Sequence, residues 1–339
     1  MLNNESNISY NDLLKVLEYR EVSRREIEQE DYIVENYTFL GGHLDKDFYR
    51  CDSKIFKPLF DSLRSGNSSY ISYLNEIIIE NEDIQPNMVS CLIKDLQNKK
   101  SSAISEVVGS QIMNYFNAPT VFNAVSTINI FDEKWYYTMS ADFVKEGDKY
   151  YLFDEYLNLD YLEIDINQLE HVDKIVKFFK KTKFQYDTYG QQKKKIIRDF
   201  IMSTLVRKLV INDWDFNERN CGIIFNDQKQ SVQLINFDYE MGLAESQKSV
   251  FKSEFAEQIM QYVKYNFPKI YNEFIDKLKQ LSLVENDVNK SSSDVFYNEA
   301  MYELFSNINN TLQIDTKLKD KKLLSFGTLK KFLSREQTL

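Results

Sequence analysis

The scarcity of glycine restricts this chain more than any other feature of its sequence. Nine of the 339 residues are glycine, which is less than half of the roughly 7% that is average in proteins. The sequence contains no G-x-G-x-x-G, no G-x-x-x-x-G-K-[ST] and no G-x-S-x-G pattern. These patterns place glycine where the backbone turns tightly or approaches a phosphate. We therefore exclude a Rossmann dinucleotide site, a conventional P-loop and a hydrolase nucleophile elbow.

Charge and composition exclude further classes of protein. The 42 Lys and Arg residues face 52 Asp and Glu residues, a net charge of -10, so we expect no nucleic-acid binding through phosphate neutralisation. Cys51, Cys91 and Cys221 are an odd set without paired spacing, which is typical of a reducing compartment. With His43 and His171 as the only histidines, we expect neither a zinc site nor a histidine-dependent catalytic triad. We also expect no secretory signal and no membrane helix.

The order of the predicted elements suggests an α+β protein. A capping box predicts a helix over residues 9–29. Short β-branched and aromatic segments then predict antiparallel strands between residues 70 and 157. One helix interrupts these strands, beginning near Ser102 or Ser105 and ending before Pro119. From about residue 167 the pattern is helical to the end, apart from a hairpin over residues 221–238 and a polar linker at 285–294.

The densest polar cluster lies between a long apolar helix and this hairpin. Asp215 and Asn220 stand five residues apart in it, and Asp238 follows at the end of the hairpin. Phosphoryl transfer needs a carboxylate that orients the attacking hydroxyl, and it needs hard oxygen ligands for Mg²⁺. Asp215 suits the first role, whereas Asn220 and Asp238 suit the second. A polar loop of this kind is usually a solvated turn, but the position of Asp238 favours the functional interpretation.

A second pair of charged residues lies in the β-rich part of the chain. Lys94 ends a predicted strand, and Glu106 follows twelve residues later in the first turns of the next predicted helix. A kinase uses a strand Lys to bind the nucleotide phosphates and a helix Glu to hold that Lys. Each residue is ordinary by itself. Their order upstream of Asp215, Asn220 and Asp238 strengthens the kinase hypothesis.

Together these motifs resemble the HipA-like branch of the protein-kinase-like superfamily, over residues 60–280. Asp215 to Asn220 matches its D-x-x-x-x-N catalytic loop, and residues 237–239 resemble its D-F-G segment. The resemblance implies that Gly66 and Asn67 lie in the phosphate loop and that Ser140 and Asp142 lie in the adenine-contacting strand. Arg219 stands where the family often has a Lys, and it would neutralise phosphate charge.

The resemblance implies a two-lobed protein-kinase-like fold. Residues 1–60 would form a helical extension, residues 61–160 a β-rich nucleotide-binding lobe, and residues 161–339 a helical catalytic lobe. The implied activity is an ATP- and Mg²⁺-dependent Ser/Thr protein kinase. Its protein substrate is unknown, an antitoxin-like partner is compatible with it, and it would be cytoplasmic or translocated as an effector.

Two alternatives stay open at this stage. A small-molecule kinase of the aminoglycoside or choline type also has Asp five residues before Asn, and residues 235–240 have some of its later acidic motif. Two positions are unfavourable to that alternative. The first Asp of its motif would be Asp213, but the residue five positions later is Glu218, and its later acidic residue would stand at position 236, which is Asn. The second alternative is a kinase-fold interaction protein that catalyses no transfer. Binding of ATP with Mg²⁺, and then product formation, would separate these possibilities.

Overall fold

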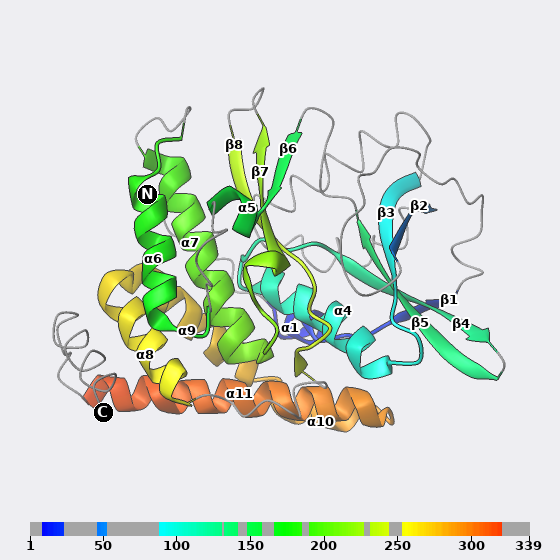
Figure 1. Ribbon diagram of the computed structural model, residues 1–339. Coiled ribbons are helices and arrows are strands. Elements are labelled where there is room, and N and C mark those ends of the chain that lie inside the picture. Colours follow the sequence, from blue (N-terminus) through cyan, green and yellow to red (C-terminus); the bar gives the residue numbers. More distant parts are fainter. Residues whose placement is uncertain are drawn as a thin grey trace, which may run out of the picture.

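Figure 1 shows the arrangement of the chain in a computed structural model. The structure describes residues 9–23, 46–52, 88–130, 132–141, 148–157, 166–184, 190–226, 231–243 and 253–320. Two small sheets and a group of packed helices make up this part of the chain. The predicted α+β class, with a β-rich part followed by a mostly helical part, is confirmed.

The first sheet has five strands in the order β1-β4-β5-β3-β2. The strands are β1 (Glu21–Ser23), β2 (Lys46–Asp52), β3 (Met88–Asp95), β4 (Asn123–Ile130) and β5 (Glu133–Ala141). β1 pairs with β4 in parallel, and the other neighbours are antiparallel. In the centre of the sheet, Lys94 of β3 lies opposite Thr138 of β5. The pairing register of β3 with β5 therefore determines the position of Lys94 along the sheet.

The second sheet contains the predicted hairpin and one more strand. Its strands are β6 (Asp148–Leu152), β7 (Cys221–Asn226) and β8 (Ser231–Asn236), and they are antiparallel in that order. The strand predicted to reach residue 157 ends at Leu152, and the helix α5 (Phe153–Leu157) follows. The Leu152 N–H donates to the Glu155 carboxylate at 3.2 Å. This capping contact ends the strand and begins the helix.

The helices lie beside and below the two sheets in the view of Figure 1. They are α1 (Tyr10–Val16), α4 (Lys100–Tyr115), α6 (Leu169–Lys181), α7 (Gln191–Val206), α8 (Ser253–Asn266), α9 (Pro268–Ser282), α10 (Glu285–Ser291) and α11 (Val295–Asp320). A π-helical segment (Arg207–Ile211) extends α7, and a short 3₁₀ turn (Glu218–Asn220) precedes β7. None of the described helices is long and apolar enough to span a bilayer.

One predicted helix limit is wrong, and a segment predicted as a linker is partly helical. Ser9 caps α1 by accepting from the Asp12 N–H, as the capping box predicts, but the helix ends at Val16, well short of residue 29. α4 begins at Lys100, two residues before Ser102, so the predicted start near that residue is confirmed, although no side chain caps the helix. α10 occupies the predicted polar linker at 285–294. The first helix is short because the chain soon afterwards pairs with β4 at Glu21–Ser23.

α4 is the helix that connects the sheet to the helical part. Nearly all of its residues are buried, because one side packs on β4 and β5 while other sides pack on α7 and α11. A small apolar cluster joins it to the sheet, formed by Leu96, Ala103, Val107, Val125 and Tyr136. Its opposite side joins the large core of the helical part. A helix buried on all sides is held rigidly, so the side chains that it carries are well positioned.

Candidate active site

Lys94 and Glu106 form a buried ion pair between β3 and α4. The Lys94 ammonium lies 3.3 Å from the Glu106 carboxylate, and only 2% of Glu106 is exposed. The second Glu106 oxygen accepts a hydrogen bond from the Asn123 amide at 2.9 Å, and the Ser140 hydroxyl donates to Asn123 at 2.5 Å. These bonds connect three strands with α4. They hold the Glu106 carboxylate facing Lys94.

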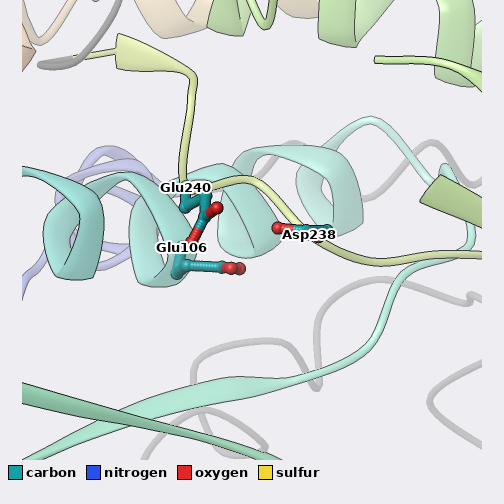
Figure 2. Close-up of side chains that lie close together, drawn as sticks. All are labelled: Glu106, Asp238 and Glu240. Carbon is teal, nitrogen blue, oxygen red and sulfur yellow. The ribbon is translucent and has the colours of Figure 1, made fainter. Parts of the chain in front are cut away.

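Two further carboxylates meet the Lys94 ammonium from the segment after β8. Asp238 lies 2.8 Å from the Lys94 nitrogen, and Glu240 lies 2.7 Å from it. Figure 2 shows Glu106 on α4 and the other two acids on the neighbouring segment. One oxygen from each of the three carboxylates lies within 4.8 Å of the others. The site therefore gathers three negative charges around one positive charge.

The environment shifts the pKa values of these groups in opposite ways. Burial alone would lower the pKa of Lys94, but the three carboxylates outweigh burial and raise it, so the ammonium stays charged. Burial raises the pKa of Glu106, and Lys94 opposes that rise. Removing the ammonium would leave Glu106 as a buried carboxylate without its cation. The pair is therefore interdependent.

The loop between the π-helical segment and β7 holds Asp215 by its backbone. The carbonyl of Asp215 accepts hydrogen bonds from the side chains of Asn217 at 2.8 Å and Asn220 at 3.0 Å. Its N–H donates to the buried Asp213 carboxylate at 3.2 Å. The Asp215 side chain is half-buried. Burial is the first cause that raises its pKa, and the carboxylates of Asp213 and Asp238 add to the rise.

The structure thus brings five of the predicted site residues into one region, namely Lys94, Glu106, Asp215, Asn220 and Asp238. Ser140 joins it through Asn123. Arg219 is exposed, and its N–H bonds to the Asn217 side chain at 2.8 Å. Gly66, Asn67 and Asp142 lie outside the described residues.

Sequence reasoning missed Glu240 as a partner of Lys94 and Asn123 as a support for Glu106. Glu240 follows Asp238 by two residues, but this segment is a turn in which Asp238 has a left-handed backbone, so the spacing alone did not indicate that both carboxylates reach Lys94. Asn123 gave no signal either, because an Asn at the start of a strand is common and its contact depends on how α4 packs.

Comparison with known proteins finds a likeness among solved structures. No protein-family model and no curated protein matches the chain. The chain is similar in structure to CtkA, a Helicobacter pylori proinflammatory kinase. The similarity covers 66% of this chain and 88% of the kinase, at 12% sequence identity and a TM-score of 0.41. Identity this low does not carry a residue's role from one chain to the other.

Proposed function

We propose that this chain is a kinase that uses ATP and Mg²⁺ and transfers the γ-phosphate to a hydroxyl group. One observation carries the proposal, which is the contact of the Lys94 ammonium with both Glu106 and Asp238. A strand Lys, a helix Glu and an acid after a hairpin are the parts that protein kinases use to hold nucleotide phosphates and metal. One carboxylate is enough to pair the charge of Lys94, so three carboxylates around this mostly buried ammonium leave an excess of negative charge that a bound cation would balance.

Asp238 and Asn220 are the residues that would hold Mg²⁺. Their donors are a carboxylate and a side-chain amide oxygen, the hard ligands that Mg²⁺ prefers. The Asn220 amide nitrogen donates to the Asp215 carbonyl, so its amide oxygen is the atom available to a cation. Bound Mg²⁺ would neutralise the charge of the β- and γ-phosphates. The chemistry of these donors fits the metal.

Lys94 would bind phosphate after giving up one of its present contacts. An ammonium group has three N–H donors, and Lys94 lies within 3.3 Å of three carboxylates. Each donor thus faces an acid of the protein. Glu106 is the buried partner that orients Lys94, whereas Asp238 and Glu240 are partly exposed and can be replaced by a phosphate oxygen. Gly66, Asn67, Ser140 and Asp142 would complete the nucleotide site, and the exposed Arg219 would add positive charge.

Asp215 would orient the acceptor hydroxyl and take its proton. Two asparagine side chains and the Asp213 carboxylate fix its backbone, so the position of its carboxylate is determined before substrate binds. Its raised pKa makes it a better proton acceptor than an ordinary aspartate. The acceptor that we propose is a Ser or Thr of a protein. An amino-sugar or choline-like alcohol is the alternative, and the acceptor panel below separates the two.

Labelled ATP tests the proposal directly. The parent chain, Asp215→Asn, Asp238→Asn and the exposed control Asp276→Asn are incubated with Mg²⁺ and labelled ATP, with lysate protein or small alcohols as acceptors. We expect transfer by the parent and the control, and a loss of about 100-fold or more in Asp215→Asn. ATP at ~100 times its dissociation constant should stabilise the parent by about 2.7 kcal/mol. Equal transfer by Asp215→Asn would refute its role, and no stabilisation of the parent would refute the kinase proposal.

A further inference from the structure

Arg207 is a fully buried cation at the junction of α7 and the catalytic loop. It is the first residue of the π-helical segment, and its side chain has 0% exposure. A buried guanidinium is costly unless every N–H is satisfied and its charge is paired. The groups that satisfy and pair the guanidinium therefore indicate the role of Arg207.

All five N–H donors of Arg207 are used, and they connect two segments of the site. Two donors reach the buried Asp213 carboxylate, one of them at 2.7 Å. A third donor reaches the Asn220 carbonyl at 3.1 Å. The last two reach the carbonyls of Phe237, at 2.9 Å, and Asp238. The guanidinium thus bonds to the backbones of both proposed metal ligands, Asn220 and Asp238.

Two aromatic rings hold the guanidinium in one plane. Its carbon lies 4.3 Å from the centre of the Phe216 ring and 4.4 Å from the centre of the Tyr239 ring. Tyr239 is itself anchored, because its hydroxyl bonds to Thr120 at 2.6 Å and its carbonyl accepts from Ser105 at 2.6 Å. Stacking of this kind fixes the direction of the planar fork of Arg.

The bond to the Asp238 carbonyl has a particular consequence. Asp238 has a φ of 65°, in the left-handed region that is unfavourable for residues other than glycine. In this conformation its carbonyl meets Arg207 while its carboxylate meets Lys94. The hydrogen bond from Arg207 to this carbonyl helps to hold Asp238 in that conformation.

We infer that Arg207 is a positioning residue for metal binding, an inference that rests on the proposed kinase function. By bonding the Asn220 and Asp238 carbonyls at once, it sets the spacing between the two ligand side chains. A fork of five fixed donors performs this function, and the point charge of Lys cannot replace it.

The Mg²⁺ requirement for ATP binding separates positioning from stability. The parent, Arg207→Lys and Arg198→Lys are titrated with Mg²⁺ at fixed ATP, and the ATP-dependent rise in melting temperature is recorded. Arg198 is a matched control on the same helix, since it bonds the Asn117 carbonyl at 2.8 Å and the Glu273 carboxylate at 2.6 Å. We expect Arg207→Lys to need about tenfold more Mg²⁺ for the half-maximal rise, and Arg198→Lys to match the parent within about twofold.

An unchanged Mg²⁺ midpoint in Arg207→Lys, even with a lower melting temperature, would overturn the inference. If Arg207→Lys does not fold, Phe216→Leu replaces it, because this variant loosens the stack and keeps every hydrogen bond. Phe216→Leu should shift the midpoint in the same direction by a smaller factor, and no shift would again overturn the inference. If the parent shows no rise with ATP and Mg²⁺, the proposed function itself fails, which is a separate outcome.

Discussion

Replacing Asp213 with Asn removes the one negative charge that the Arg207 guanidinium bonds. Asp213→Asn keeps the shape of the side chain, and its amide oxygen can still accept the Asp215 N–H, but its NH2 group then replaces the oxygen that accepts both Arg207 bonds. The change therefore tests charge more than packing. Both partners are almost fully buried, with 0% of Arg207 and 1% of Asp213 exposed. Water has no access to compensate for the lost carboxylate.

The expected loss of stability follows from this burial. Removing one partner of a buried ion pair costs about 3–5 kcal/mol, since the remaining charge stays in a medium of low polarity. The Asn220, Phe237 and Asp238 carbonyls continue to accept from Arg207, which places the expected loss near the lower value. The double variant with Arg207→Met should lose less than the sum of the two single changes. It should not recover fully, because the Phe237 and Asp238 carbonyls lose the Arg207 donors, at a cost of up to about 1–3 kcal/mol each, whereas the Asn220 carbonyl still accepts from the Phe237 N–H at 3.2 Å.

Urea unfolding of the four chains in this cycle measures the coupling. Glu170→Gln is the control, because the Glu170–Lys174 pair is 62% and 47% exposed and should contribute less than about 0.5 kcal/mol. A loss below about 1 kcal/mol in Asp213→Asn, or strict additivity in the double variant, would contradict the reasoning. Either result would mean that water or a rearranged loop compensates the guanidinium.

Two further predictions concern Glu240 and Lys277. Glu240→Gln should lower the dissociation constant of metal-free ATP by about threefold or more. The reason is that Lys94 loses a competing carboxylate and the phosphates meet less negative charge. Weaker ATP binding that is found only with Mg²⁺ would instead make Glu240 a metal ligand. Burial lowers the pKa of Lys277 to about 8, so the unfolded chain binds more protons between pH 8 and 10.5. The free energy of unfolding of the parent, relative to that of Lys277→Met, should therefore rise by up to about 3 kcal/mol as the pH rises over that range. This gain should be lost as the pH falls through 8. A difference in urea unfolding that does not change with pH would contradict the prediction.

Much of the order of the elements from β3 onward could be predicted from sequence, but β1, β2, α5 and α10, the limits of the elements and their long-range pairing could not. The hairpin and the sequence β3, α4, β4, β5 follow from periodicity and from turn residues. The first helix was predicted too long because apolar spacing continues past Val16, whereas the chain pairs at Glu21–Ser23 with β4, about one hundred residues away. Local patterns carry no information about a partner at that distance.

In the candidate site, too, local contacts could be predicted from sequence and long-range contacts could not. Lys94 and Glu106 could be paired from sequence because a strand, a turn and the first turns of a helix leave their side chains few alternatives. Arg207 could not be identified, since an Arg near the end of an amphipathic helix usually faces solvent. Its function depends on burial under Phe216 and Tyr239, which only the tertiary structure reveals.

Two of the few glycines stand where the folded chain packs too closely for a side chain. A Cβ atom on Gly109 of α4 would lie 3.0 Å from the Tyr239 Cβ, and one on Gly242 would lie 2.5 Å from a methyl group of Ile211. Both are closer than side chains pack. These glycines let the segment that carries Asp238 and Glu240 approach α4 and the π-helical segment. Gly109 and Gly242 thus permit the segment with Asp238 and Glu240 to pack closely on its neighbours. The guanidinium of Arg207 then bonds to the backbone of the same segment.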